Sequence, residues 1–177
     1  MICMAGVDES YPGHLLCVRQ KQTDGNMAGT IRTVGIIGAG QMGSGIAHVC
    51  AVAGYNVLIH DQSAEQLEKA IATVNGNMAR QVSHGKLDEA AREQAMALIR
   101  PALRMEDLSS VDLAIEAATE DETVKRKIFA QLCPNLNPEA ILATNTSSIS
   151  ITRLAATTDR PERFIGMHFF NPVPASL

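Results

Sequence analysis

The sequence predicts an α/β fold in which helices cover both faces of a mostly parallel sheet. Short apolar runs with strand character alternate along the chain with longer amphipathic segments, as in proteins built from successive β-α units. A glycine-rich motif joins the first apolar run to the first helical segment, and acidic or small polar side chains follow several later runs. In such folds ligands bind at the carboxyl edge of the sheet, so these side chains mark the expected site.

Apolar periodicity gives the order of the elements. We predict strands near residues 33–37, 56–60, 113–116, 140–144 and 163–167, with a weaker strand near 102–105. We predict helices over residues 43–53, 63–84, 88–99 and 121–132. Because two consecutive helices between neighbouring strands exceed the usual crossover, 63–84 and 88–99 are expected to form a helical hairpin that projects from the sheet.

The glycine-rich motif predicts a dinucleotide site. It reads Gly-Ala-Gly-Gln-Met-Gly over residues 38–43, between the first strand and the first helix. Gly38 allows the tight turn, Gly40 lets the backbone approach a pyrophosphate, and Gly43 lets the helix pack closely on the strand. A lone GxGxxG is a weak signal, but here the strand, the helix and a later acidic residue fall where a Rossmann-type fold requires them.

The acidic residue is Asp61, which ends the second apolar run. A carboxylate at this strand end accepts hydrogen bonds from the adenosine ribose hydroxyls and repels a 2′-phosphate. Gln62 and Ser63 follow, with no Arg to receive that phosphate. The expected cofactor is therefore NAD rather than NADP.

Three later segments carry polar groups at the same expected edge. Glu116 and Glu120 lie at and just past a strand end, although acids also suit the N-terminus of the helix that follows. The run Thr144–Ser148 offers either hydrogen-bond donors for a substrate or cofactor, or ordinary helix caps. A lone histidine is most often structural, but His168 follows a strand at this edge, and removing a hydride from an alcohol carbon requires a base for the hydroxyl proton.

Composition narrows the function classes. The chain has 177 residues and a formal charge of −4, which suits one globular domain and argues against a nucleic-acid partner. No apolar run is long enough to span a bilayer, and the four cysteines show no metal-binding spacing, so we expect free thiols in a cytoplasmic protein with no metal site. We interpret residues 1–30 as a leader, with Met27 as the natural start, and residues 31–177 as the domain.

In combination, the segments at 38–47, 116–120, 143–148 and 166–174 resemble the 3-hydroxyacyl-CoA dehydrogenases, most closely their bacterial 3-hydroxybutyryl-CoA branch. The resemblance runs from about residue 33 to residue 174. It implies oxidation of a 3-hydroxyacyl-CoA to a 3-ketoacyl-CoA with NAD, or the reverse, in fatty-acid or butanoate metabolism.

The resemblance also implies roles for individual residues. His168 would be the general base, and Ser147 would hydrogen-bond the reacting oxygen. The helical hairpin would contact CoA, with Asn77 and Lys86 as the candidate residues. The cofactor-binding residues would be Gly38, Gly40, Gln41, Met42, Gly43 and Asp61, together with Glu120, Lys125 and Asn145 at the nicotinamide–ribose end.

One departure from the family bears on activity. In the family the catalytic His pairs with a Glu shortly after the His-Phe-Phe-Asn-Pro motif, and a helical domain then closes over the substrate and forms the dimer interface. This sequence reads Val-Pro-Ala-Ser-Leu over 173–177 and carries neither. We therefore expect NADH binding with little turnover, by a chain that is monomeric or weakly self-associating. A non-catalytic NAD-binding module and a dehydrogenase of 3-hydroxy acids without CoA remain as alternatives.

Overall fold

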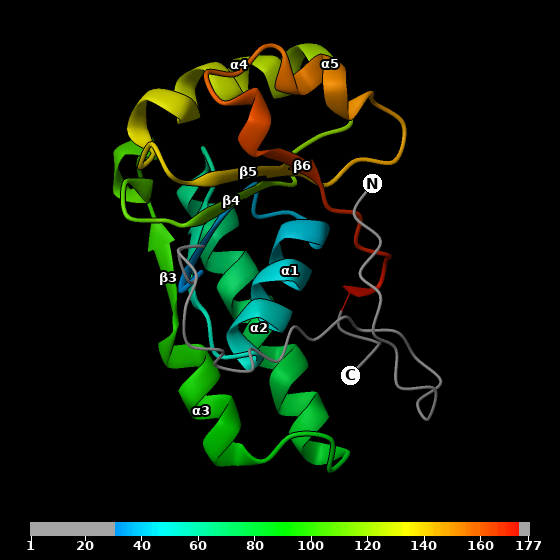
Figure 1. Ribbon diagram of the computed structural model, residues 1–177. Helices are drawn as coiled ribbons and strands as arrows, with labels where there is room; N and C mark the ends of the chain where they lie inside the picture. Colours follow the sequence, from blue (N-terminus) through cyan, green and yellow to red (C-terminus); the bar gives the residue numbers. More distant parts are fainter. Residues whose placement is uncertain (1–30, 174–177) are drawn as a thin grey trace, which may run out of the picture.

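The computed structural model describes residues 31–173, which form a parallel sheet with helices on both faces (Figure 1). The strand order is β3-β2-β1-β4-β5-β6, and every neighbouring pair is parallel. The strands are β1 (Thr33–Ile37), β2 (Asn56–His60), β3 (Ile99–Ala102), β4 (Leu113–Glu116), β5 (Ile141–Thr144) and β6 (Phe164–Gly166). The order reverses direction at β1, where a doubly wound sheet opens its ligand crevice.

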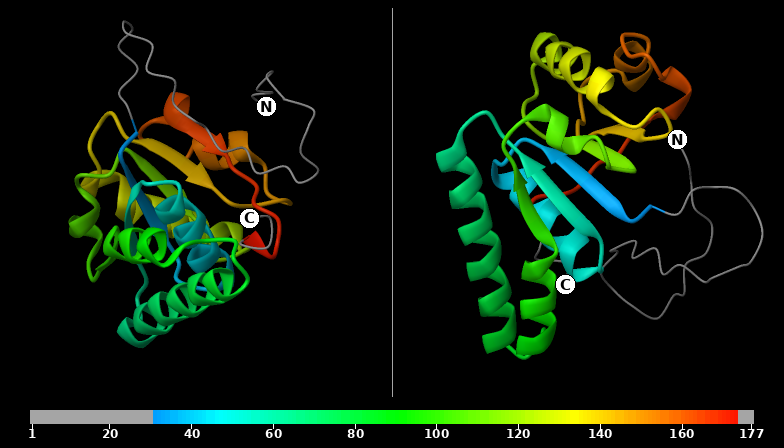
Figure 2. Two further views of the ribbon diagram at one scale, coloured as in Figure 1. Left: turned by 90° about the horizontal axis from the view of Figure 1, so that it is seen from below. Right: turned by 90° about the vertical axis from the view of Figure 1, so that its left-hand side faces the viewer.

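The helices form two layers, each with its own apolar core (Figures 1 and 2). Helices α1 (Gln41–Val52), α2 (Ala64–Ser83) and α3 (Glu89–Ala97) cover one face, where Ile36, Ile46 and Val74 pack. Helices α4 (Glu122–Leu132) and α5 (Ile151–Ala155) cover the other face, around Phe129 and Leu142. Three short 3-10 turns complete the elements, at Met105–Leu108, Cys133–Asn135 and Pro161–Arg163. The predicted fold class is confirmed.

Helices α2 and α3 form the predicted hairpin, which extends past the end of the sheet (Figure 2). The Ser63 hydroxyl caps α2 by accepting from the Gln66 amide at 3.2 Å, and the Asp88 carboxylate caps α3. Gly85, with a φ of +68°, makes the connection between the two helices. The hairpin thus follows from caps and a glycine that are readable in the sequence.

Some predicted boundaries were wrong. The strand expected near 102–105 lies at 99–102, and α3 ends at Ala97 rather than at 99. Pro101 belongs to β3, an edge strand whose open side tolerates a residue without an N–H. Helix α1 begins at Gln41, two residues before the predicted 43, and α5 was not predicted because five residues show little periodicity.

The leader, the cysteines and the expected absence of a membrane span and a metal site are the other features predicted from the sequence. The leader proposed for residues 1–30 lies outside the described residues. Cys50 and Cys133 are free thiols, and burial raises the pKa of Cys50 to about 12, so this thiol stays neutral. Within residues 31–173 no helix is long and apolar enough to cross a bilayer. No cluster of potential metal ligands occurs among the same residues.

His48 is a buried titratable group in the interface between α1 and α2. Its side chain is fully buried, and its Nε2 donates to Gln81 Oε1 at 2.9 Å. The other ring nitrogen, Nδ1, has no hydrogen-bond partner among the described residues. Protonation would therefore place an unpaired charge inside the core, and burial lowers the pKa of His48.

This arrangement predicts an acid-sensitive core. Because the folded-state pKa lies below the unfolded value of 6.5, neutral His48 leaves stability intact above that value, and stability is lost as pH falls through the lower folded pKa. We expect His48→Gln to reduce the fall in unfolding free energy between about pH 7 and pH 5, measured by urea denaturation. An equal fall in both proteins would contradict the assignment, and His84→Gln, at an exposed position, is the control.

Candidate functional site

The predicted site residues follow one row of the sheet. His60, Ile37, Glu116, Thr144 and Gly166 lie opposite one another in register across β2, β1, β4, β5 and β6. The polar residues of each segment come just after this row, so the parallel register delivers them to one edge. The structure therefore brings to that edge groups that lie far apart in the sequence, as the strand-end pattern predicted.

The turn from β1 to α1 has the geometry of an anion site. Gly38 adopts a φ of +104°, and a Cβ there would lie 2.6 Å from Ala118 Cα. A Cβ on Gly43 would lie 1.7 Å from the Gly38 carbonyl oxygen, so both positions require glycine. Helices α2 to α5 each have a side-chain cap, whereas α1 has none, and Gly40 and Gln41 at its start are exposed. The uncapped N–H groups of the α1 first turn, which includes Met42, fit a pyrophosphate.

Asp61 lies beside this turn and helps to hold it. One carboxylate oxygen accepts from the Ala39 amide at 2.9 Å and the other accepts from the Ser63 amide at 3.0 Å. Gln66, from α2, donates to the Ala39 carbonyl oxygen at 2.9 Å. Ala39 is thus fixed from both sides, and the contact of half-buried Asp61 with ribose hydroxyls stays a prediction.

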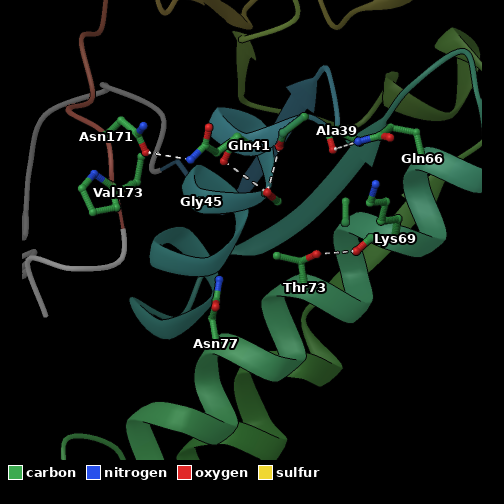
Figure 3. A pocket seen from close by; sticks show the side chains of 13 residues that line it. Ala39, Gln41, Gly45, Gln66, Lys69, Thr73, Asn77, Asn171 and Val173 are labelled. Carbon is green, nitrogen blue, oxygen red and sulfur yellow. Dashed lines mark hydrogen bonds between the residues drawn. The ribbon is translucent and has the colours of Figure 1, made fainter.

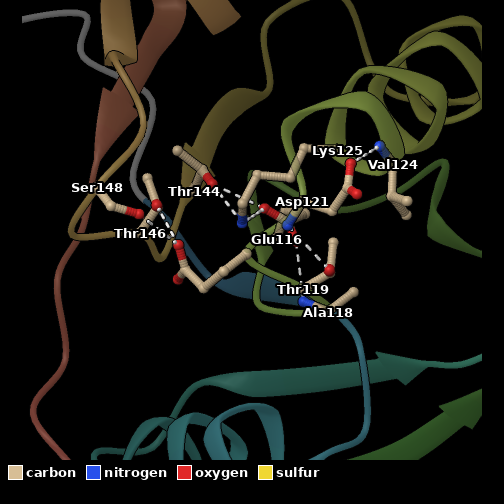
Figure 4. A network of polar contacts seen from close by, with 10 residues as sticks. Glu116, Ala118, Thr119, Asp121, Val124, Lys125, Thr144, Thr146 and Ser148 are labelled. Atoms are coloured by element: carbon tan, nitrogen blue, oxygen red, sulfur yellow. Dashed lines mark hydrogen bonds and ion pairs between the residues drawn. The ribbon is translucent and has the colours of Figure 1, made fainter.

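The polar run Thr144–Ser148 supplies contacts rather than a helix cap. Helix α5 is capped by Ser150, which lies beyond the run. The Thr146 hydroxyl donates to Glu120 at 2.6 Å and the Ser148 hydroxyl donates to it at 3.3 Å (Figure 4). Ser147 remains exposed between these two residues. The loops after β4 and β5 are therefore joined through an exposed carboxylate, with Ser147 open to the edge.

Lys125 lies deeper than the other candidates. Its side chain and that of Glu116 both have 0% exposure, and the two form an ion pair (Figure 4). The Thr144 hydroxyl donates to the same Glu116 oxygen at 2.7 Å and accepts from Lys125 at 3.2 Å. Lys125 thus faces Glu116 and Thr144 in the interior, so its direct contact with a cofactor stays a prediction.

His168 lies in an extended segment that follows β6. The Met167 amide donates to the Thr144 carbonyl, and the Phe169 amide donates to Asn145 Oδ1, both at 3.0 Å. His168 is exposed between these anchors, and its ring centroid lies 4.8 Å from that of Phe170. Asn145, predicted near the nicotinamide, is buried and uses its amide oxygen to hold this segment.

A pocket of about 400 Å³ opens beside the start of α1 (Figure 3). Asn77 of α2 is part of its wall, whereas Lys86 lies in the connection from α2 to α3 and is not, and contact of either residue with CoA stays a prediction. Its lining residues are Ala39, Gly40, Gln41, Ser44, Gly45, Gln66, Lys69, Ala70, Thr73, Asn77, Asn171, Pro172 and Val173. The pocket therefore joins the glycine turn, the hairpin and the segment that carries His168.

Two contributors to this site were missed in the sequence. Gln66 donates to the Ala39 carbonyl oxygen in the glycine turn. Asn171 accepts from Gln41 Nε2 at 3.2 Å, which connects the His168 segment to α1. Asn171 precedes Pro172 in the quoted motif, so the motif offered a signal for it. Gln66 offered none, because a polar residue in the first turn of a helix is ordinary.

Comparison with known proteins agrees with this geometry. The family described as "3-hydroxyacyl-CoA dehydrogenase, NAD binding domain" matches residues 33–176. A 3-hydroxybutyryl-CoA dehydrogenase of Bradyrhizobium diazoefficiens is 60% identical over 148 residues, which cover 84% of this chain and 50% of that protein. A 3-hydroxybutyryl-CoA dehydrogenase of Mycobacterium tuberculosis is 45% identical over 84% of this chain and 52% of its own length. The chain thus spans about half the length of these relatives.

Solved structures lead to the same family. An (S)-3-hydroxybutyryl-CoA dehydrogenase from Ralstonia eutropha superposes with a TM-score of 0.80 at 51% identity, over 82% of this chain and 51% of that one. The family match covers nearly all described residues and includes the glycine turn, the polar loops and the His168 segment. The chain therefore belongs to the 3-hydroxyacyl-CoA dehydrogenase family, and residues 33–176 form its NAD-binding domain.

Proposed function

We propose that this protein catalyses NAD-dependent oxidation of 3-hydroxyacyl-CoA, with 3-hydroxybutyryl-CoA as the preferred substrate, or the reverse reduction. The observation that carries the proposal is that Ser147 and His168 follow adjacent strands at the edge that also holds the glycine turn. Support for the substrate comes from relatives at 45–60% identity, which are named as 3-hydroxybutyryl-CoA or 3-hydroxyadipyl-CoA dehydrogenases.

The chemistry divides between the cofactor and the chain. Bound NAD supplies the hydride acceptor, and residues of this chain orient the alcohol and manage its proton. His168 takes the hydroxyl proton in oxidation, because imidazole exchanges protons near neutral pH. Ser147 donates a hydrogen bond to the reacting oxygen, and Glu120 and Asn145 shape the loop that borders the nicotinamide.

The pocket beside α1 is proposed to receive the CoA part of the substrate. It runs from the glycine turn to Asn77 on the hairpin, and Asn171 on its wall lies three residues after His168. A thioester extending from His168 could therefore continue into this pocket. The side chain of Lys69, also on its wall, offers a positive charge for CoA phosphates.

Two similar solved structures are enzymes named for substrates without CoA, and they represent the alternative function. A diketoreductase and a 5-formyl-3-hydroxy-2-methylpyridine-4-carboxylic acid 5-dehydrogenase are 29% and 30% identical to this chain, with TM-scores of 0.77 and 0.72. Their identities are lower than those of the CoA-named relatives, which favours a CoA substrate. A cytoplasmic location, and dimerisation through a helical domain, stay predictions.

Two glycines provide a matched test of cofactor binding. A Cβ on Gly40 meets nothing within 4 Å, whereas a Cβ on Gly43 meets backbone at 1.7 Å. We expect Gly40→Ala to keep the melting temperature and raise the NADH dissociation constant roughly tenfold, because the methyl group blocks the pyrophosphate. Gly43→Ala should lower the melting temperature, since overpacking costs about 1–3 kcal/mol.

The measurements for this test are circular dichroism melting and titration calorimetry with NADH. Gly76→Ala, on α2 with open space around its Cβ, is the control and should bind NADH normally. Undiminished NADH binding by Gly40→Ala would show that the cofactor does not approach this turn.

The catalytic roles are tested by initial rates of NADH oxidation with acetoacetyl-CoA. Among the described residues no carboxylate forms a hydrogen bond or ion pair with the His168 ring, and loss of such a partner lowers turnover by roughly 10⁴-fold in serine proteases. We expect tight NADH binding, slow turnover, and a further loss of about 10²–10³-fold in Ser147→Ala. His168→Gln should lower the rate by about 10²–10⁴-fold.

Controls separate the alternatives. NADPH should be a poor substitute because of Asp61, and free acetoacetate should react more slowly than acetoacetyl-CoA. A residual rate that neither substitution changes would refute the proposed roles. Rapid turnover by the unsubstituted chain would mean that His168 needs no carboxylate partner.

A further inference from the structure

Leu103 is a large apolar side chain that lies exposed at the ligand edge of the sheet. It follows Ala102, the last residue of β3, and its exposed fraction is 66%. It packs in neither of the two apolar cores. Single exposed leucines are common on protein surfaces, so exposure alone does not mark a site. The position of Leu103 relative to the predicted cofactor residues is more specific.

Leu103 and Asp61 hold equivalent positions at the ends of neighbouring strands. His60 of β2 and Ala102 of β3 lie opposite each other in register, and Asp61 and Leu103 are the next residues. Neighbouring strands lie about 4.8 Å apart, so Leu103 is about one strand spacing from the carboxylate that is predicted to bind the adenosine ribose. A base attached to that ribose can reach the Leu103 side chain.

The order of the strands gives the direction in which the adenine nucleotide extends. The glycine turn for the pyrophosphate follows β1, Asp61 follows β2, and Leu103 follows β3. These strands are neighbours in the order β3-β2-β1 (Figure 1). The chemical groups of the nucleotide are linked in the matching order of pyrophosphate, ribose and base. A base that continues in this direction lies at the end of β3, away from the loops after β4 and β5.

Contacts on both sides hold the backbone of Leu103 in place. The buried His60 ring donates from Nδ1 to the Ala102 carbonyl oxygen at 2.9 Å. After Leu103, the Arg104 amide donates to one Asp107 carboxylate oxygen at 3.0 Å, and the Arg104 guanidinium donates to the other at 3.2 Å. The exposed side chain is therefore presented by an ordered backbone, which reduces the conformational entropy lost when a ligand covers it.

We propose that Leu103 forms part of the adenine site of this NAD-binding domain, with its side chain against one face of the base. The contact removes apolar surface of the leucine and of the flat ring from water. The proposal rests on the predicted contact of Asp61 with the adenosine ribose, and it is independent of whether the chain turns over a CoA thioester.

The test compares three ligands that carry different parts of the cofactor. NADH has both halves, ADP has only the adenosine half, and reduced nicotinamide mononucleotide has only the other half. We expect Leu103→Ser to raise the dissociation constants of NADH and ADP by the same factor, about fivefold to tenfold, because an apolar contact is lost. The affinity for the mononucleotide should not change. Titration calorimetry measures NADH and ADP, and nicotinamide fluorescence measures the mononucleotide.

Two further substitutions at the same position sharpen the test. Leu103→Met keeps an apolar side chain of similar volume, so this matched control should bind all three ligands normally. Leu103→Tyr should bind NADH and ADP at least about threefold more tightly, because aromatic rings stack on bases. All variants should keep the melting temperature of the unsubstituted protein, since the side chain is exposed.

Other outcomes would overturn the proposal. Weakening of the mononucleotide by Leu103→Ser to the same extent as NADH would mean that the substitution disturbs the whole site. Unchanged NADH and ADP affinities in both the Ser and Tyr variants would mean that the base lies elsewhere, although the domain still binds NAD. If the unsubstituted protein binds neither NADH nor ADP, cofactor binding at this edge is itself refuted.

Discussion

Parallel register at the carboxyl edge of the sheet is the constraint on which this site depends. The backbone ladder continues one residue past the aligned row, because the Gly38 amide donates to His60 and the Ala117 amide donates to Ile37. Asn145 continues it onto Glu116. A slip of one residue would turn alternate side chains to the opposite face, so one register fixes both the apolar cores and the polar edge. One alignment of the strands therefore brings together the glycine turn, the loop after β4 that carries Glu120, and the loop after β5 that carries Ser147.

Charge is distributed unevenly around that edge. The surface pair between Arg126 and Glu122 is partly exposed, and pairs of this kind contribute about 0–1 kcal/mol. Glu116 and Lys125 are fully buried, where the loss of one partner would leave a charge without solvent. Loss of one partner is therefore more costly for the interior pair than for the surface pair, while the exposed Glu120 accepts from Thr146 and Ser148 at the surface of the same edge.

The sequence predicted what short-range chemistry determines. The fold class could be predicted from helix caps such as Ser63 and Asp88, from the glycine turn and from the apolar runs. The same features predicted the sheet edge at which the candidate site residues lie. The sequence did not locate β3, because a proline such as Pro101 can either end a helix or lie in an edge strand. The sequence alone does not show which of these two positions the residue occupies. Nor could it separate Lys125 from Glu120. Both follow β4 by a few residues, and only the packing of α4 turns one side chain inward and leaves the other exposed.

The segment after β6 shows how backbone anchors hold a histidine in an exposed position. Met167 and Phe169 pack against the apolar core, and Asn171 accepts from Gln41, so alternate residues of the segment face the protein. In an extended chain the intervening residues must then face outward, which accounts for exposed His168 and for Phe170 at 78% exposure. Within residues 31–173 the imidazole contacts the Phe170 ring but no hydrogen-bonding side chain. The chain thus fixes the position of His168 through its neighbours, and the role of this histidine as a base stays a prediction.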